Sequence, residues 1–214
     1  MNTSKWDVLL VNCGVPIVEA HKWSAAFSAV ITEEIMPKNE VFAFLGQVLW
    51  ESEYLKRTEE NLDYSSARLV ELFPKRITVD QAQLYGRNAS HPSNPEAIAN
   101  IIYGGEWGSA KLGNMQVGDG WRFRGSGPFQ ITGRRNVEAA AKWTELPYVN
   151  NPDLLRKPGY EAVEACVWYW ETIVGGRWTD PVARRKAING GILGLQETVA
   201  LTRRVESAWN ALGF

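Results

Sequence analysis

Two glutamates and a glycine-rich segment are the parts of this sequence that could perform chemistry together. Glu51 and Glu60 lie nine positions apart, and the segment Phe123–Gly133 follows later in the chain. Two carboxyl groups can act as general acid and general base on a glycosidic bond, and an inverting glycosidase holds them roughly 6.5–9.5 Å apart. Glycines let a backbone approach a sugar closely. The combination predicts a sugar-cleaving enzyme, although each half alone is usually structural.

Glu51 falls on the apolar face of a predicted helix that begins near an N-cap at Asn39. Phe44 and Val48, seven and three residues earlier, lie on the same face. Burial disfavours the charged form of a carboxyl group, so this position suits a group that keeps its proton until it acts as a general acid. The structural alternative is a glutamate at a helix end that turns toward water.

Glu60 can work with Glu51 only if the helix between them is interrupted. A straight helix would turn about 900° and rise about 13.5 Å over nine residues, which places the two carboxylates on opposite sides. The sequence therefore predicts a break between Leu55 and Glu59, with Thr58 as the N-cap of the helix that follows. Glu59 competes with Glu60 for the role of base.

The rest of the chain has mostly helical periodicity. Apolar side chains recur at intervals of three and four, and no alternating pattern is strong enough to predict a major sheet. Residues 77–119 mix short helical pieces with turns and are expected to wall a cleft. The fold class is therefore mostly α. The predicted helices span residues 20–35, 39–55, 79–85, 134–143, 158–173 and 195–212, with a turn at 188–191.

The composition is that of an ordinary globular protein. The chain has 214 residues, of which 45% are hydrophobic and 22% charged, so it can bury a sizeable core. Its net charge of −1 is unevenly divided, because 10 basic and 15 acidic residues precede Arg122, whereas 13 and 9 follow from there. The basic second half could face an acidic polymer, but no run of like charge is long enough to predict a nucleic-acid partner.

Residue content argues against several kinds of site. Cys13 and Cys166 are too few and too far apart for a disulfide framework or a metal site. His21 and His91 are the only histidines, and no group has zinc-ligand spacing, so neither metal catalysis nor a Ser-His-Asp triad is expected. No cofactor is predicted. The N-terminus lacks a secretory pattern, and no apolar run approaches the roughly 20 residues that cross a bilayer.

Four motifs, in order along the chain, resemble glycoside hydrolase family 19 and most closely its bacteriophage endolysin branch. They are QVLWES (47–52), EENLDYS (59–65), FRGSGPFQITG (123–133) and INGG (188–191), and the resemblance extends from about Trp23 to the C-terminus. It implies a lysozyme-like, mostly α-helical fold of two lobes around a central sugar-binding cleft. It further implies a single catalytic domain over 1–214 without a separate cell-wall-binding domain, hydrolysis with inversion, and no cofactor.

The resemblance also assigns roles to individual residues. Glu51 matches the general acid, Glu60 the general base, and Thr132 the hydroxyl group that helps to hold the attacking water. Asn189 could equally be a turn residue beside two glycines. Hydrogen bonds to the substrate are implied for Gln130, Asn136 and Asn189, and for an arginine of the last helix, either Arg203 or Arg204.

Two positions depart from the family pattern. Ser126 stands where arginine is usual between the two glycines, and Glu53 stands where the family has a small residue. Trp107 and Trp121, in turn-rich segments, are candidates for stacking on sugar rings. Tryptophans at helical positions indicate core packing instead: Trp168, Trp170 and Trp209.

These observations favour an endolysin-type peptidoglycan hydrolase that cleaves the β-1,4 bond between N-acetylmuramic acid and N-acetylglucosamine for host cell lysis. Such a protein is expected to be a monomer, made in the host cytoplasm without a signal peptide, that acts in the periplasm or cell wall after a holin-type partner opens the membrane. A chitinase acting on N-acetylglucosamine polymers is the main alternative. A lytic transglycosylase and a sugar-binding protein without catalytic activity are weaker ones.

Overall fold

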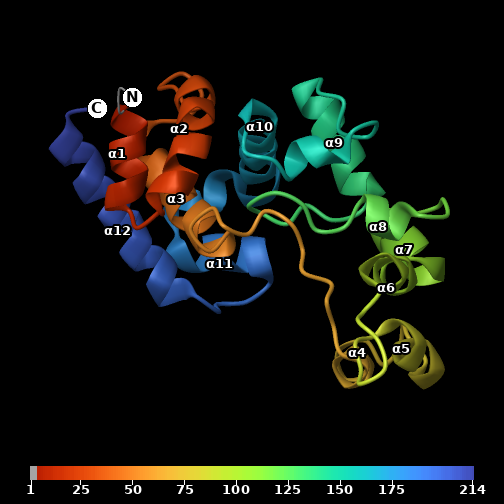
Figure 1. Cartoon of the computed structure of the whole chain (residues 1–214). Helices are drawn as coiled ribbons and strands as arrows, with labels where there is room; N and C mark the ends of the chain where they lie inside the picture. Colours follow the sequence, from red (N-terminus) through yellow and green to blue (C-terminus); the bar gives the residue numbers. More distant parts are fainter. Residues whose placement is uncertain (1–3) are drawn as a thin grey trace.

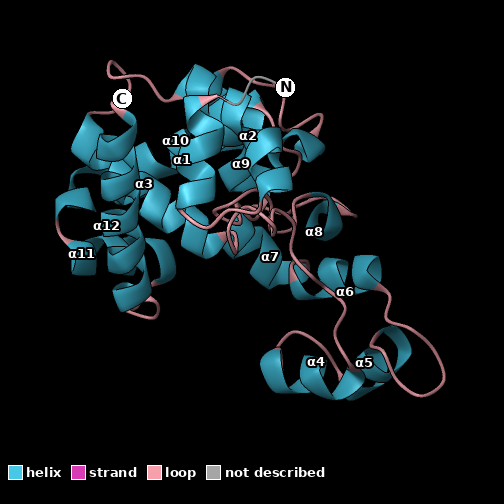
Figure 2. Cartoon of the chain, turned by 60° about the vertical axis from the view of Figure 1, so that its left-hand side comes forward, coloured by secondary structure: helices cyan, strands magenta, loops and turns pink. Residues whose placement is uncertain are grey.

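The computed structural model describes residues 4–214, which form helices joined by turns and extended segments (Figure 1; Figure 2). No strand occurs among these residues, which confirms the mostly α fold expected from the sequence. None of the described helices is long and apolar enough to span a membrane. The helices are α1 (Lys5–Asn12), α2 (Ile17–Val30), α3 (Lys38–Glu51), α4 (Ser66–Leu72), α5 (Val79–Tyr85), α6 (Pro95–Ile102), α7 (Gly105–Leu112), α8 (Asp119–Arg122), α9 (Arg134–Thr144), α10 (Tyr160–Tyr169), α11 (Pro181–Asn189) and α12 (Leu195–Leu212), with helical turns η1 (Pro152–Leu155), η2 (Trp170–Val174) and η3 (Gly175–Thr179).

The largest hydrophobic core lies between α1, α2, α3, α10 and α12 (Figure 1). Trp23 and Phe44 are fully buried in it. α3 and α12 approach closely at Gly46, where a Cβ atom would lie 2.6 Å from the Thr202 hydroxyl oxygen. This packing fixes the C-terminal end of α3, where Glu51 lies. The tryptophans expected to be structural are buried, as predicted: Trp168, Trp170 and Trp209.

Two smaller cores support the segments that carry the other candidate residues. One is formed by α4, α5 and α6 around Leu69 and Ile98, and both views show α4 and α5 at the opposite end of the molecule from α1 and α12 (Figure 1; Figure 2). The other lies under the glycine-rich segment, where Phe123 and Ile131 pack against side chains of α9 and α10. The glycine-rich segment is therefore anchored from below by its own apolar side chains.

Most predicted helices are present, and their ends differ by a few residues. α5 and α12 begin and end as predicted, and α9 is longer by one residue. α2 ends at Val30 instead of continuing to residue 35, because the backbone of Ile31 is extended. The helix predicted for 158–173 is regular only within α10 and continues as the wider π-helical turn η2. The turn-like residues before Pro95 cap a helix, because the Asn94 side chain accepts the Ala97 amide at the start of α6.

The predicted break between the two glutamates is present, but it begins earlier than expected. α3 ends at Glu51 itself, so the two carboxylates are not on one helix. Two details of the prediction are wrong. The N-cap of α3 is Pro37 instead of Asn39. Thr58 caps no helix, because its hydroxyl group donates to the Arg156 carbonyl at 2.6 Å and residues 57–64 are not helical.

The start of α1 is held by Asp7, and we expect Asp7→Asn to lower the free energy of unfolding by about 2 kcal/mol at pH 7. Burial opposes ionisation of this carboxyl group, which is 5% exposed, but hydrogen bonds from Ser4, Ser24 and His21 outweigh it and lower the pKa from 3.8 to about 2. Because folding lowers this pKa, the stabilisation is complete well above pH 3.8 and is lost as the pH falls toward 2.

Urea unfolding of both proteins at pH 7, 4 and 3 measures the effect of Asp7→Asn. The difference in free energy of unfolding should shrink at pH 3, whereas the exposed Asp80→Asn control should change little at any pH. A difference for Asp7→Asn that stays constant over this range would contradict the prediction.

Candidate active site

The carboxyl group of Glu51 lies against a buried arginine. Arg185 of α11 forms an ion pair with Glu51 Oε1 and donates from Nη1 to Gln47 Oε1 at 2.9 Å. The Arg185 side chain is 1% exposed and the Glu51 side chain 24% exposed. The burial expected for Glu51 is therefore partial, and its carboxyl group has a buried cation as a partner.

Arg185 is also tied to Asn189 through the loop 190–194. The Leu193 carbonyl accepts from Arg185 Nε at 2.9 Å and from the Asn189 side-chain amide at 3.0 Å. Asn189 Oδ1 accepts from the Gly191 amide at 2.9 Å. The Asn189 side chain thus holds its own turn, as the structural alternative predicts, and keeps one N–H and one lone pair for a ligand.

A left-handed turn follows α3 and reverses the chain. Glu53, Tyr54 and Leu55 have φ values of 49°, 61° and 65°, a conformation that costs roughly 1–2 kcal/mol per residue when repeated outside glycine. The buried Ser52 hydroxyl accepts from the Leu55 amide at 2.9 Å, and the Leu55 side chain is buried in the main core. Burial of Leu55 offsets the strain, and the reversed chain returns toward the glycine-rich segment.

The Glu60 carboxylate is held directly on the glycine-rich segment. The Tyr103 hydroxyl donates to Glu60 Oε1 at 2.6 Å, and the Gly125 amide donates to Oε2 at 3.1 Å. A Cβ atom on Gly125 would lie 2.7 Å from Gln130 Oε1 and 3.2 Å from Glu60 Oε2, so both side chains approach this glycine closely. Burial, reinforced by the charge of Glu60, raises the pKa of Tyr103, which therefore keeps its proton as a donor.

Glu59 has a different partner. Arg124 donates from Nε and Nη2 to Glu59 Oε1 at 2.8 and 2.5 Å, and its guanidinium lies 3.7 Å from the centre of the Trp121 ring. The charge of Glu59 is thus matched by a cation, whereas Glu60 has neutral donors, which favours Glu60 as a base. Ser126, which stands where arginine is usual, is 1% exposed, and its hydroxyl donates to the Arg124 carbonyl at 2.7 Å. Arg124 therefore supplies the positive charge in this part of the glycine-rich segment.

Thr132, Gln130 and Asn136 form one hydrogen-bonded series, and Gln130 Oε1 lies near Gly125, as Glu60 does. The Thr132 hydroxyl donates to the Gln130 carbonyl at 2.9 Å, and the Asn136 side-chain amide donates to the Thr132 carbonyl at 2.8 Å. Gln130, with a φ of 52°, donates from Nε2 to the Gly127 carbonyl at 3.0 Å. Because these hydrogens are already used, the Thr132 hydroxyl oxygen and Gln130 Oε1 are left to accept hydrogen bonds.

Tyr169 lies near both the glycine-rich segment and Glu51. Its ring stacks on Phe129 of the glycine-rich segment at 4.9 Å between ring centres. Burial raises the pKa of Tyr169, and the charge of Glu51 raises it further, so the same side chain also lies near Glu51. A cavity of about 520 Å³ opens beside Glu51 and is lined by Trp50, Glu51, Glu53, Tyr54, Lys56 and Arg57.

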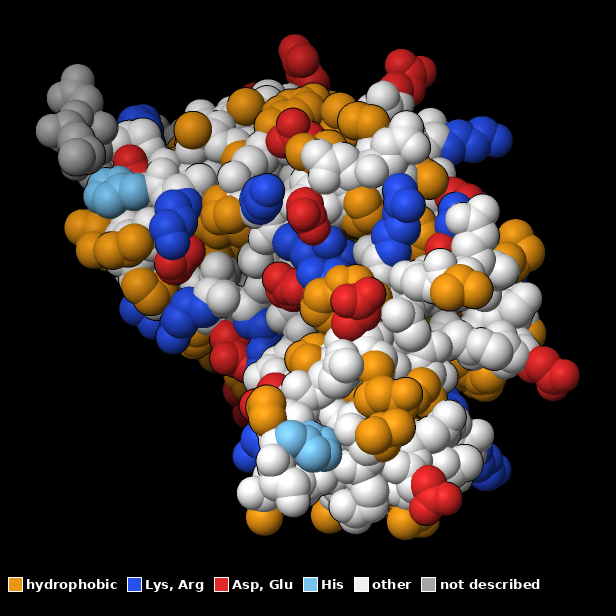
Figure 3. Space-filling view, turned by 45° about the vertical axis from the view of Figure 1, so that its right-hand side comes forward, with side chains coloured by type: hydrophobic (Ala, Val, Ile, Leu, Met, Phe, Trp, Pro, Cys, Tyr) orange, Lys and Arg blue, Asp and Glu red, His pale blue; other side chains and the backbone are white. Residues whose placement is uncertain are grey.

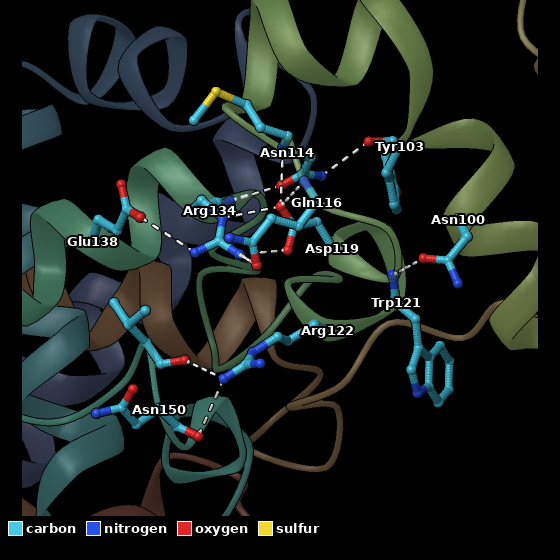
Figure 4. A network of polar contacts seen from close by, with 12 residues as sticks. Asn100, Tyr103, Asn114, Gln116, Asp119, Trp121, Arg122, Arg134, Glu138 and Asn150 are labelled. Atoms are coloured by element: carbon cyan, nitrogen blue, oxygen red, sulfur yellow. Dashed lines mark hydrogen bonds and ion pairs between the residues drawn. The ribbon is translucent and has the colours of Figure 1, made fainter.

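A network of polar contacts holds the chain on both sides of the glycine-rich segment (Figure 4). Asp119 accepts from two backbone amides at 2.9 Å each and forms an ion pair with Arg134 at 2.6 Å. Burial opposes ionisation of Asp119, but the hydrogen bonds from Arg134 and the backbone outweigh it and lower its pKa. Asn100 accepts from the Trp121 amide at 2.9 Å. These contacts keep the segment rigid where it meets Glu60.

The two tryptophans proposed as sugar platforms each carry an arginine on one ring face. The Arg76 guanidinium lies 3.4 Å from the centre of the Trp107 ring, and the Arg124 guanidinium 3.7 Å from that of Trp121. A sugar could therefore stack only on the opposite face of either ring. Figure 3 shows basic side chains at the centre of one face of the molecule, among acidic and hydrophobic ones.

Comparison with known proteins decides the family. No family model matches the chain. A glycosyl hydrolase family 19 domain-containing protein of Haemophilus influenzae is 34% identical over 169 residues, which cover 75% of this chain and 75% of that protein. The chain belongs to glycosyl hydrolase family 19. An acidic endochitinase of Petunia hybrida is 33% identical over 133 residues, which cover 52% of this chain and 51% of that enzyme, so the match spans about half the length of the plant relative.

The fold of this family 19 hydrolase agrees with solved structures. A bacterial family 19 chitinase superposes with a TM-score of 0.55 at 19% identity, over 97% of this chain and 93% of that one. The helical, lysozyme-like fold implied by the sequence motifs is thus confirmed, and so is the expectation of a glycoside hydrolase.

Sequence reasoning missed two residues of the candidate site, Arg185 and Tyr103. Arg185 lies in the basic run 184–186, which is typical of a solvated helix face. One signal was available, because Arg185 and Asn189 are four residues apart on a helix and so share a face. Tyr103 had no such signal, since its contact with Glu60 joins residues 43 positions apart.

Arg185→Met should lower both stability and activity of the hydrolase. Gln47 Oε1, the Leu193 carbonyl and the quarter-exposed Glu51 carboxylate would lose their common donor, at a cost of about 2–3 kcal/mol. The melting temperature should fall by roughly 4–12 °C. The rate should fall about tenfold, because Glu51 and the loop 190–194 would no longer be held in place.

Arg184→Met is the matched control for this experiment. Arg184 is also buried on α11, but it donates to the Trp178 carbonyl and does not contact Glu51. Calorimetry and a cleavage assay on both variants make the comparison. Equal loss of activity in the two variants would assign the effect to folding alone.

Proposed function

We propose that this family 19 hydrolase is an endolysin-type peptidoglycan hydrolase that cleaves the β-1,4 bond between N-acetylmuramic acid and N-acetylglucosamine with inversion. The observation that carries the proposal is the separate positioning of two carboxyl groups: Glu51 beside Arg185, and Glu60 between Tyr103 and the glycine-rich segment. The four sequence motifs supply the support for the endolysin branch.

Glu60, in this proposal, activates the attacking water together with Thr132. The Thr132 hydroxyl hydrogen is used on the Gln130 carbonyl, so its oxygen accepts one hydrogen of the water. The water's other hydrogen points to the Glu60 carboxylate, which takes it as the water oxygen attacks the anomeric carbon. The water thereby directs a lone pair at the sugar. Gln130 Oε1, beside Glu60, accepts a hydrogen bond from the substrate.

Glu51 donates the balancing proton. As the glycosidic bond breaks, the leaving oxygen takes the Glu51 proton, so one proton is gained by Glu60 and one is lost by Glu51. A bound sugar would cover the exposed part of Glu51, beside the Arg185 guanidinium. Asn136 and the remaining N–H of Asn189 supply further hydrogen bonds to the sugar's amide and hydroxyl groups.

The biological setting is part of the same proposal. The protein is a monomer made in the host cytoplasm, and it reaches the periplasm or cell wall through a membrane lesion made by a holin-type partner. No nucleic acid and no cofactor take part. The acid, base, hydroxyl and amide groups of the chain account for each proposed step without a cofactor.

Mass spectrometry of the products from intact peptidoglycan tests the proposed function. Cleavage in water enriched in oxygen-18 should give fragments with reducing N-acetylmuramic acid ends that carry one heavy oxygen. Anhydro-sugar ends without the label would indicate a lytic transglycosylase instead. Binding without any product would indicate a sugar-binding protein.

A chitinase is the second candidate, and the similarity to the Petunia endochitinase favours it. Chitin oligomers carry the same N-acetylglucosamine groups that the site amides would bind. Reducing-sugar assays on purified peptidoglycan and on chitin oligomers, run side by side, separate the two functions. Cleavage of chitin alone would overturn the endolysin proposal.

A further inference from the structure

Arg76 lies between aromatic rings on the turn that joins α4 to α5. Its guanidinium is 3.4 Å from the centre of the Trp107 ring and 5.7 Å from that of Phe73. The Arg76 side chain is half-buried, and Trp107 is 37% exposed. Stacking on indole fixes the plane of the guanidinium, so its N–H groups point outward from the ring edges in a defined direction.

The charge of Arg76 has no carboxylate partner among residues 4–214. Its one hydrogen bond is a long one, from Nη1 to the Ile102 carbonyl at 3.4 Å. Four other arginines of the candidate site and its surroundings form ion pairs: Arg57 with Glu53, Arg68 with Glu71, Arg124 with Glu59 and Arg185 with Glu51. Arg76 therefore presents an oriented fork of donors with its charge open to a ligand.

Arg76 contacts the backbone next to Tyr103, the residue that holds the proposed general base. The residue that follows its acceptor Ile102 is Tyr103, whose hydroxyl donates to Glu60. The charges of Glu60 and Arg76 both act on that hydroxyl, in opposite directions. A glycan bound at Glu60 would therefore pass near the Arg76 guanidinium.

We propose that Arg76, oriented by Trp107, binds a carboxylate carried by muramic acid or its peptide and so selects peptidoglycan over neutral glycans. The inference rests on the proposed function, since chitin has no carboxylate for this cation. Planar guanidinium and carboxylate groups match each other through two parallel hydrogen bonds. A guanidinium without a carboxylate partner adds no ion pair to an uncharged polymer, whereas an acidic polymer gains affinity from it.

The test compares native peptidoglycan with the same material after its carboxyl groups have been converted to amides. For the wild-type protein, amidation should raise KM about tenfold, as expected for a half-buried charged pair. Arg76→Gln should raise KM on native peptidoglycan by a similar factor, and amidation should add no further loss. The contact is the same in ground and transition states, so kcat should change little. Added salt should weaken only the wild-type preference.

Arg68→Gln is the control, because Arg68 lies on the adjacent α4 but is 51% exposed and paired with Glu71. Its KM should match that of the wild type on both substrates. Removing the peptides with an amidase takes away the peptide carboxylates and frees the lactyl carboxylate, which is an amide wherever a peptide is attached. On these strands a persisting Arg76→Gln effect shows that the lactyl group fills the contact when it is free, and loss of the effect assigns the contact to the peptide.

Equal KM for wild type on native and amidated peptidoglycan would overturn this inference and leave the proposed function standing. A further rise in the KM of Arg76→Gln on amidated substrate would also overturn it, because two changes that remove the same contact cannot have additive effects. No cleavage of peptidoglycan by the wild-type protein would overturn both.

Discussion

Glu51→Gln is expected to lower kcat at least a hundredfold on the glycan that the enzyme cleaves, within the roughly 10²–10⁴ of general acid catalysis. Glutamine has the same size, and its carbonyl oxygen can still accept from Arg185, so the local packing is kept. What it lacks is a proton that can leave with the glycosidic oxygen. The melting temperature should therefore change little, and KM should stay near the wild-type value.

Glu53→Gln is the control for the acid. Its carboxylate is 59% exposed and pairs with Arg57, two residues along a left-handed turn from Glu51. We expect this variant to keep most of its activity. Reducing-end release, measured with both variants at matched protein concentration, makes the comparison. A Glu51→Gln protein that retained more than a tenth of the rate would exclude Glu51 as the acid.

The local pattern of the sequence predicted those parts of the fold that depend on local interactions. α5 has a Thr78–Gln81 capping box and α12 a long apolar stripe, and both were predicted at their true ends. Residues 57–64 were expected to begin a helix, yet Gly125 and Gly127 pair with the backbones of Glu60 and Thr58. Contacts of such separation leave no trace in the periodicity of either segment.

The left-handed turn after Glu51 could not be predicted for a similar reason. Glu53, Tyr54 and Leu55 include no glycine or asparagine, so nothing in their types favours positive φ. The conformation is stabilised by a local hydrogen bond to the Ser52 hydroxyl and by burial of Leu55, and only the folded core supplies that burial. The candidate carboxylates could be named from the sequence motifs, whereas their partners Arg185 and Tyr103 depend on tertiary packing.

Glu60→Gln should also lower kcat at least a hundredfold, whereas Glu59→Gln should cost no more than about fivefold. The two residues are neighbours, but their surroundings differ. Glu60 receives hydrogen bonds from the neutral groups Tyr103 and Gly125 and forms no ion pair among residues 4–214, so taking a proton from water breaks no ion pair. Glu59 is matched by Arg124, and its side chain is 47% exposed.

The product analysis makes the Glu60 prediction decisive. With Glu60 replaced, the water is held by Thr132 alone and no group takes its proton, so hydrolysis should slow while Glu51 can still protonate the leaving oxygen. An inverting hydrolase therefore loses its rate without changing its product. If Glu60→Gln kept full activity and released anhydro-sugars, the reaction would need one acid and no positioned water, and Glu60 would not be the base. If Glu59→Gln lost the hundredfold instead, the base would be Glu59, and the ion pair with Arg124 would have to open during the reaction.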